Sequence, residues 1–326
     1  MNPVARLIAA VGIACAASGV CATQSDAQTP TYPNRPVKVV VPFPPGGVVD
    51  IVARIFVQHL TDRLGHSFYV ENRAGASGNI GAAMVQAADP DGYTVMITSS
   101  NFLINPGIQK VSYDAVRGFS PIAILSASPS VLAVNPKEKP STVKELIEAV
   151  RKEPGKYSYA SAGVGSPPHL QGEMFKQAFG LDILHVPFAG GGPALQSAVG
   201  GHTPIVISAL PPAITFIQSG GLRGLAVIGR KRTPSLPDVP TMAEAGVPDQ
   251  DSEMILLALS PAGTPKDIVT LLNREMNTIV RMPDVVKQLD SLGFSPLGSS
   301  VEEASVRIKK DLDMWAKVIR DAKLAK

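Results

Sequence analysis

The sequence has little charge, few aromatic residues and almost no cysteine. Charged residues make up 17% of its 326 residues and aromatic residues 5%, whereas about 25% of a typical soluble domain is charged. The 30 basic and 27 acidic residues nearly balance, giving a formal net charge of +3. Binding to the phosphate backbone of nucleic acids needs clustered lysine and arginine. The composition therefore argues against a nucleic-acid-binding protein.

Cysteine is confined to the first residues of the chain. Cys15 and Cys21 are the only two, too few for a disulfide framework. Both lie in a segment where Arg6 precedes an uncharged apolar run, and small residues at 20–22 and 25–27 fit signal-peptidase cleavage. We expect residues 1–27 to be a cleaved signal peptide, which leaves a cysteine-free mature protein in the periplasm.

Two other interpretations of this leader remain open. The apolar run 7–20 could anchor the chain, but it is shorter than the ~20 residues that span a bilayer. Cys21 could carry a lipid, but Val20 directly before it is bulky for a lipoprotein signal. No later segment reaches the length of a membrane span, so we expect a soluble mature protein.

Short β-branched stretches alternate with helical periodicity along most of the mature chain, which is typical of parallel sheets with crossover helices. The first series predicts strands at 37–41, 68–70 and 93–97 and helices at 49–64 and 80–88. The second predicts strands at 157–160, 183–187, 205–208 and 222–228 and helices at 169–179, 192–199 and 213–218. The fold class is therefore α/β, with two such units.

The segments around these two series complete the prediction. The range 121–134 holds two extended stretches split at Ser128-Pro129, and Ser141 is expected to cap a helix over 142–151. Residues 230–250 read as an irregular connection, followed by a strand at 254–259. Long helical patterns cover 265–292 and 301–324.

Loops rich in glycine, proline and serine follow most expected strands. Ligands of open α/β sheets bind beyond the carboxyl ends of the strands, where helix N-termini favour anions. Donor-rich, uncharged loops of this kind suit a carboxylate. The candidate ligand-binding residues are Phe43, Pro44, Gly46, Gly47, Asp50, Asn79, Ser99, Ser100, Ser161, Gly163, Gly165, Ser166, His169, Phe188, Ala189 and Gly190. Asp50 has two interpretations: a charge that complements the helix dipole, or an acid that contacts the ligand.

Catalytic and cofactor motifs are missing. The sequence has no P-loop, no dinucleotide fingerprint, no G-x-S-x-G elbow and no H-E-x-x-H motif. The five histidines lack metal-ligand spacing. We therefore expect no cofactor, no metal and no enzymatic activity. One alternative remains, a secreted hydrolase that uses Ser166, His169 and an acid such as Asp50.

Several motifs in a fixed order resemble the Bug family, the periplasmic solute receptors of tripartite tricarboxylate transporters. The resemblance covers nearly all of the mature chain. The motifs are Tyr32-Pro33, Pro42-Phe-Pro-Pro-Gly-Gly-Val-Val-Asp50-Ile-Val-Ala-Arg54, Val70-Glu-Asn-Arg73, Gly78-Asn-Ile-Gly-Ala82, Pro90-Asp-Gly-Tyr93, Ser161-Ala-Gly163, Gly165-Ser166, His169-Leu170, His185-Val-Pro-Phe188, Leu225-Ala-Val227, Leu236-Pro-Asp-Val-Pro-Thr241, Glu244-Ala-Gly246 and Pro261-Ala-Gly-Thr-Pro265.

The resemblance implies a bilobal periplasmic binding protein of type II, the Venus-flytrap fold, with two Rossmann-like lobes joined by a hinge. Lobe 1 would comprise residues 28–127 and 230–326, and lobe 2 residues 128–229. The implied function is capture of a small organic carboxylate between the lobes and its delivery to membrane transporter subunits. The receptor itself is expected to be a monomer. The family's ligand contacts map onto Phe43–Gly47, Ser161–His169 and the Phe188–Gly192 loop.

The sequence departs from the family pattern at two places. Ala189-Gly190 stands where the family often has Lys-Gly, and Gln196 stands where it often has Asp. The stretch before Pro261-Ala-Gly-Thr-Pro265 lacks the usual aromatic residue. These departures leave the identity of the carboxylate open and favour a more apolar pocket. A sensory receptor that presents its ligand to a membrane kinase is the second alternative.

Overall fold

The structure is a computed structural model that describes residues 32–247 and 252–325. By its internal contacts the chain divides into a short unit up to Asn34 and a long unit from Arg35 onward. The expected signal peptide, with its cleavage positions and both cysteines, lies outside the described residues.

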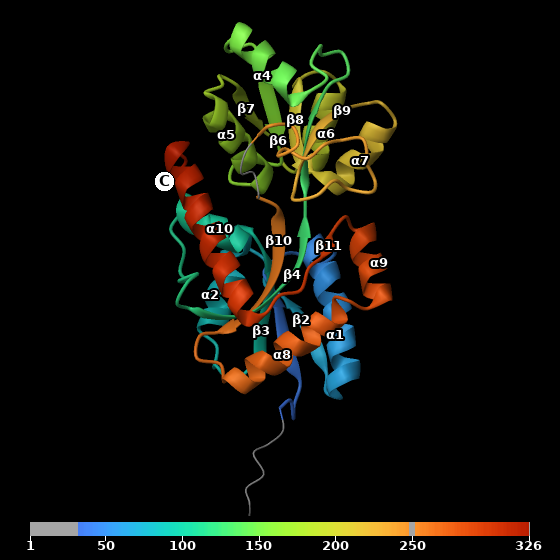
Figure 1. The fold of residues 1–326 in the computed structure, drawn as a ribbon. Coiled ribbons are helices and arrows are strands. Elements are labelled where there is room, and N and C mark those ends of the chain that lie inside the picture. Colours follow the sequence, from blue (N-terminus) through green and yellow to red (C-terminus); the bar gives the residue numbers. More distant parts are fainter. Residues whose placement is uncertain (1–31, 248–251, 326) are drawn as a thin grey trace, which may run out of the picture. The chain divides into compact units, whose positions relative to one another are not determined.

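A six-stranded mixed sheet forms what we call the first lobe (Figure 1). Strand β1 is parallel to β2 and β3, whereas β10 is antiparallel to β3 and β4, and β11 is antiparallel to β4. The parallel part agrees with the predicted β-α-β-α-β order. In spatial order the strands are β11 (Ser295–Pro296), β4 (Phe119–Ser128), β10 (Met254–Pro261), β3 (Thr94–Ser99), β1 (Val37–Val41) and β2 (Phe68–Asn72).

The helices of the first lobe come from both ends of the long unit. They are α1 (Val48–Leu64), the short 3-10 helix η2 (Ala76–Gly78), α2 (Asn79–Gln86), α3 (Asn101–Ile108), α8 (Lys266–Ile279), α9 (Pro283–Ser291) and α10 (Val301–Asp321). The prediction for the C-terminal part was wrong in one respect, because the helix expected over 265–292 is two helices. Pro283 occupies the first turn of α9, and the ring of a proline cannot continue a preceding helix.

A five-stranded sheet forms the second lobe. Its spatial order is β7 (Leu184–Pro187), β6 (Ser158–Ser161), β8 (Ile205–Ala209), β5 (Ser130–Val134) and β9 (Arg223–Ile228). Its helices are α4 (Val143–Lys152), α5 (Pro167–Phe179), α6 (Gly191–Val199) and α7 (Leu210–Gln218). Thr142, and not Ser141, caps α4: its side chain accepts the Glu145 N–H, while Ser141 donates to the Glu145 carboxylate.

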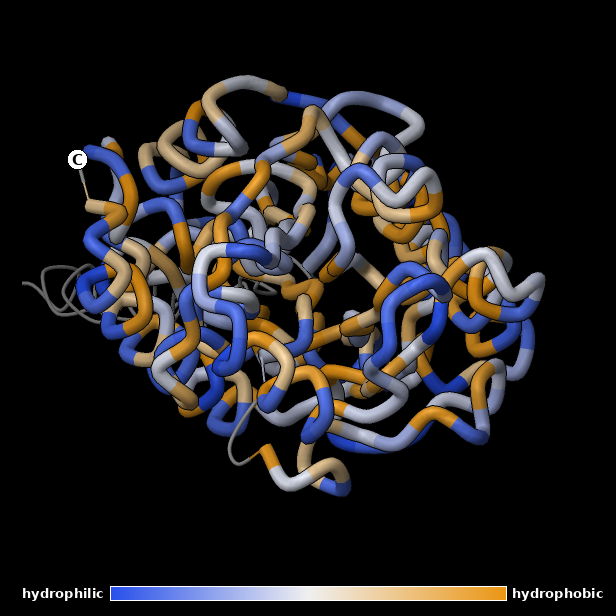
Figure 2. The backbone as a smooth tube through the Cα atoms, turned by 90° about the horizontal axis from the view of Figure 1, so that it is seen from above, coloured by the Kyte–Doolittle hydropathy of each residue, from blue (hydrophilic) through white to orange (hydrophobic). Residues whose placement is uncertain are grey.

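Apolar residues pack against both faces of the second sheet. Ile205 and Ile207 of β8 face one cluster, which includes Leu146 of α4, and Val206 faces the other, which includes Leu195 of α6. This is the two-residue alternation of a strand. The C-terminal helix is amphipathic: the tube leading to the C-terminus alternates between hydrophobic and hydrophilic segments (Figure 2).

Helix α5 links the two lobes. Its Leu170 belongs to the same buried cluster as Trp315 and Ile319 of α10, and Met174 packs against that cluster. In addition, Gln171 Nε2 donates to the Ser252 carbonyl at 2.7 Å. The N-terminus of α5 is therefore positioned by contacts with both lobes.

Candidate functional site

The loop after β1 is held in shape by one buried carboxylate. Asp50, in the first turn of α1, is 2% exposed. Its Oδ2 accepts the Gly46 N–H at 2.9 Å and Arg54 Nε at 3.0 Å, and its Oδ1 accepts Asn72 Nδ2 at 2.8 Å. The same Asn72 amide donates to the Phe43 carbonyl at 3.1 Å. These bonds fix both ends of the loop 43–46.

The pKa of Asp50 lies below its usual range. Burial raises the pKa, but the hydrogen bonds from Arg54, Gly46 and Asn72 and the charge of Arg54 outweigh this effect. Asp50 is therefore ionised at neutral pH, and three donors already occupy its oxygens. The structure gives it the role of a positioning residue for the loop.

The loop between β6 and α5 is braced by two stacked histidines. The rings of His169 and His185 are stacked with centroids 3.9 Å apart. His185 Nε2 lies 2.7 Å from Ser161 Oγ, and His169 Nδ1 accepts the Gly165 N–H at 3.0 Å. The Ser166 hydroxyl caps α5 by accepting the His169 N–H at 3.4 Å, and it donates to the Gly163 carbonyl at 2.7 Å.

Both imidazoles are neutral in this arrangement. Burial, together with the smaller effects of the neighbouring His169 and Lys176, lowers the pKa of His185 to about 3. Burial also lowers the pKa of His169, against the opposing charge of Glu173. Ser166, His169 and Asp50 are not linked to one another as a catalytic triad. Each side chain instead bonds to a backbone group of a nearby loop: Gly163, Gly165 and Gly46, respectively.

A cavity of about 400 Å³ lies among the helix starts of both lobes, and we call it the cleft cavity. Five helices begin at its wall: α1, α3, α5, α6 and α7. It is lined by Val48, Asn101, Ser128, Ser130, Ala162, Ser166, Pro167, Pro168, Gly191, Gly192, Ser208, Ala209, Pro211, Pro212, Met254, Leu292 and Phe294. Within the described part of the chain, no charged side chain lines it.

Three of these five helices, α1, α3 and α6, present backbone N–H groups in a first turn that has no side-chain cap. The first turns of α5 and α7 offer no free donor, because each contains two prolines without an N–H. Their remaining N–H groups are bonded, that of His169 to Ser166 Oγ and that of Leu210 to the Pro129 carbonyl. The first N–H groups of a helix have no partner within it, and they carry the positive end of its dipole. Helix N-termini arranged in this way suit an anion.

The structure brings several of the predicted loops together at the cavity, but only one of the predicted residues is among those that line it. Ser166 lines the cavity, and the lining residues Val48, Ala162 and Gly191 directly adjoin predicted ones. Other candidates have partners elsewhere. Ser100 Oγ accepts the Ile255 N–H at 2.8 Å, and Asn79 accepts from Asn105 at 2.7 Å. Ligand contact by each candidate residue stays a prediction.

Sequence reasoning missed several residues that line the cavity. Ser208 and Asn101 are polar, and Pro211, Met254 and Phe294 are apolar. Donors were expected in the loops that follow strands, whereas Ser208 belongs to strand β8 and Asn101 begins α3, a helix that was not expected. Phe294 follows α9, far along the chain from any of the candidate loops.

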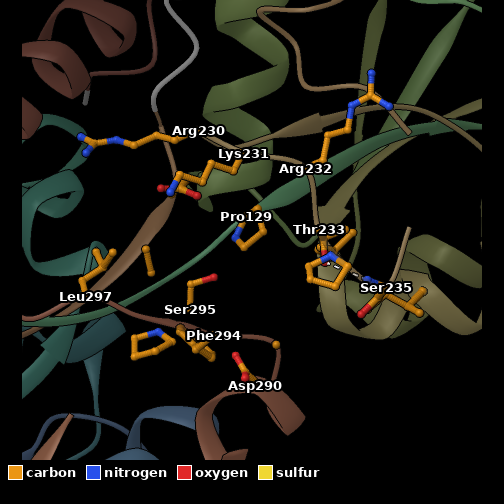
Figure 3. A pocket seen from close by; sticks show the side chains of 17 residues that line it. Pro129, Arg230, Lys231, Arg232, Thr233, Ser235, Asp290, Phe294, Ser295 and Leu297 are labelled. Atoms are coloured by element: carbon orange, nitrogen blue, oxygen red, sulfur yellow. Dashed lines mark hydrogen bonds between the residues drawn. The ribbon is translucent and has the colours of Figure 1, made fainter. Parts of the chain in front are cut away.

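A second cavity, of about 570 Å³, lies on the other side of the crossover from β4 to β5 (Figure 3). Ala127 and Pro129 line it, whereas Ser128 and Ser130 line the cleft cavity, as expected of an extended segment. Arg230, Lys231 and Arg232 lie on one side and Asp290, Phe294 and Ser295 on the other. The charges near the crossover thus border the second cavity and not the cleft cavity.

Two further findings concern the described residues only. No helix among them is long and apolar enough to cross a membrane. No group of three or more histidine, cysteine, aspartate or glutamate residues among them could hold a metal ion.

Comparison with known proteins gives consistent results. Residues 52–324 match the family model described as tripartite tricarboxylate transporter family receptor. The chain is 34% identical over 319 residues to the protein BugT of Bordetella pertussis, which covers 97% of each chain. Among solved structures, R. palustris Rpa4515 with adipate is 33% identical with a TM-score of 0.74, covering 90% of this chain and 99% of that one.

A second solved structure is MatC from Rhodopseudomonas palustris with bound malate. It is 29% identical with a TM-score of 0.69, and the match covers 88% of this chain and 100% of that one. Two α/β lobes around a cavity walled by helix N-termini define the class of periplasmic solute-binding proteins. Within that class, the chain belongs to the tripartite tricarboxylate transporter family receptors, which confirms the resemblance to the Bug family.

Proposed function

We propose that this receptor captures a small organic carboxylate in the cleft cavity and delivers it to a tripartite membrane transporter. The observation that carries the proposal is the convergence of three helix N-termini, those of α1, α3 and α6, on one cavity that no charged side chain of the described residues lines. None of these three has a side-chain cap. A carboxylate satisfies such N–H groups without a basic side chain.

The relatives support the same ligand class. Rpa4515 was solved with adipate and MatC with malate, both small carboxylates. The loop 43–47, the segment 161–169 and the loop 188–192 adjoin the cavity, and we infer that they contact or orient the ligand. Asp50, Ser161 and His169 act by fixing these loops.

We infer that the lobes divide as residues 28–127 with 230–326 and residues 128–229. The strand membership of the two sheets supports this division, because β5 to β9 form one sheet and β1 to β4 with β10 and β11 form the other. Ligand would favour a closed arrangement of the lobes because it binds both walls. We further propose that the mature protein is a periplasmic monomer released by cleavage of residues 1–27.

A thermal-shift panel of mono-, di- and tricarboxylates tests the proposal on the mature protein. A ligand that binds the folded state stabilises it and so raises the melting temperature. At a ligand concentration of a hundred times the Kd, the free energy of unfolding rises by about 2.7 kcal/mol. At least one carboxylate should raise the melting temperature in a dose-dependent way. No shift across the panel, up to millimolar concentrations, would contradict the proposed function.

A further inference from the structure

One buried hydroxyl in the cleft cavity has no partner. Ser208 lies near the carboxyl end of β8, is 1% exposed and lines the cavity. Its Oγ has no hydrogen-bond partner among the described residues. An unpaired buried hydroxyl costs about 1–3 kcal/mol, and nearly all buried polar groups in proteins are paired. The free protein therefore carries an unsatisfied group at the ligand site.

The buried side chain of Ser208 lies between an apolar cluster and the cleft cavity. Val206, two residues earlier on the same face of β8, packs in a cluster with Ala194 and Leu195 of α6. Ser208 continues this face at the point where it reaches the cavity. A valine or an alanine would fit such a position without leaving an oxygen unpaired, so packing does not account for the hydroxyl.

The N-terminus of α6 lies beside this hydroxyl. Its N-cap, Gly190, has no side-chain hydrogen bond to the helix. A Cβ placed on Gly191 would lie 3.7 Å from Ser208 Oγ, and one on Gly192 would meet nothing within 4 Å. The hydroxyl and the first N–H groups of a nine-residue helix therefore border the same open space. Together they form a donor set that suits one carboxylate.

The rest of the cavity wall suits an apolar body. It contains Pro167, Pro168, Pro211, Pro212, Met254, Leu292 and Phe294. Among the described residues, no lysine or arginine lines the cavity, so a second or third carboxylate would depend on the N-termini of α1 and α3. No acidic side chain among them lines it to accept an ammonium group. The ammonium group of an amino acid therefore finds no complementary charge there.

We propose that Ser208, with the first turn of α6, binds the single carboxylate of a ligand whose remaining body is apolar. This inference rests on the proposed function, since it names the ligand class of that same site. It assigns the ligand-binding role to a strand residue outside the family motifs and the candidate loops.

The variant Ser208→Ala tests the residue assignment. In calorimetric titration with hexanoate or benzoate, whichever binds the mature protein more tightly, we expect Kd to rise by about fivefold to fiftyfold. The ligand-free variant should melt at the same temperature or higher, because an unpaired buried oxygen has been removed. A structural role would instead lower the melting temperature and leave Kd unchanged, and that result would overturn the assignment.

Ser126→Ala is the matched control. Ser126 is 0% exposed on β4, and its hydroxyl also lacks a partner among the described residues, but it does not line the cleft cavity. Its variant should bind with an unchanged Kd. An equal loss of affinity in both variants would show a general effect of removing a buried hydroxyl and would overturn the assignment.

The ligand class is tested by comparing hexanoate with adipate and citrate. Hexanoate and adipate share a six-carbon chain and differ by one carboxylate. Tighter binding of hexanoate or benzoate, by at least about tenfold, supports the inference. Tighter binding of adipate or citrate overturns it but leaves the carboxylate receptor intact. If no acid in the wider panel binds, the proposed function itself fails.

Discussion

Asp50 Oδ2 accepts the backbone N–H of Gly46, four residues earlier, at 2.9 Å. The carboxylate that opens α1 thus fixes the loop that borders the cleft cavity. Because Asn72 ties the same carboxylate to the Phe43 carbonyl, the loop conformation depends on one ionised side chain.

Replacing Asp50 with asparagine should therefore weaken both stability and binding. Loss of charged hydrogen bonds predicts a decrease in the free energy of unfolding of about 1–3 kcal/mol and a rise in Kd of about tenfold. Chemical denaturation and calorimetry measure the two effects.

Asp267→Asn is the control, because Asp267 also lies in a first helical turn, that of α8, but is exposed. It should change stability by less than about 0.5 kcal/mol. Equal effects of the two variants would refute the loop-fixing role.

The stacked histidines predict a loss of stability in acid. The pKa of His185 falls to about 3 in the folded protein, below about 6.5 in an unfolded chain. Between these values the unfolded state binds a proton that the folded state does not, so stability falls as pH decreases from about 6.5 to about 3. His185→Gln should flatten this dependence, measured by denaturant unfolding at several pH values.

The exposed His66 provides the control variant His66→Gln, which should retain the slope of the parent. An unchanged slope in His185→Gln would contradict the prediction.

Contact between the lobes predicts a steric effect at Gly293. A Cβ there would lie 1.9 Å from Pro211 Cγ, which belongs to α7 and lines the cleft cavity. Gly293→Ala should lower the melting temperature and change ligand affinity, because the two segments must separate. Gly220→Ala separates this effect from backbone strain, since Gly220 has a similar φ of +75° but nothing within 4 Å. It should cost about 1–2 kcal/mol for the left-handed backbone alone. If both variants lose the same stability and bind alike, the steric contact is refuted.

An anion site without a charged side chain predicts weak salt dependence. Charges near the crossover border the second cavity, whereas backbone donors line the cleft cavity. Buried interactions are screened much less than exposed ones. We expect Kd to change by less than about threefold between about 20 mM and about 500 mM NaCl. A much steeper dependence would indicate that lysine or arginine side chains hold the ligand.

Much of the fold could be predicted because its strands are β-branched runs and its helices show strong periodicity. The errors have local causes. The helix α3 was missed because Asn101 follows a serine-rich stretch that reads as a loop, and Pro106 lies within the helix. The break before α9 depends on Pro283, whose effect a periodic apolar pattern hides.

The candidate site was predictable only in part. Loops after strands were correctly expected to meet, because the carboxyl ends of parallel strands share one edge. Which side chains reach the cavity depends on tertiary packing. Asp50 faces its own loop, and Ser208 faces the cavity from within a strand. Phe294 reaches the cavity only because β11 and α9 lie beside the crossover, which no local pattern shows.

The most direct test of the account is calorimetric titration of the mature protein with the tightest-binding carboxylate and with its amide, which has the same shape but no charge. We expect one bound carboxylate per chain and at least about a hundredfold weaker binding of the amide, a difference of about 2.7 kcal/mol. Equal binding of the acid and its amide would contradict the claim that converging helix N-termini recognise a carboxylate.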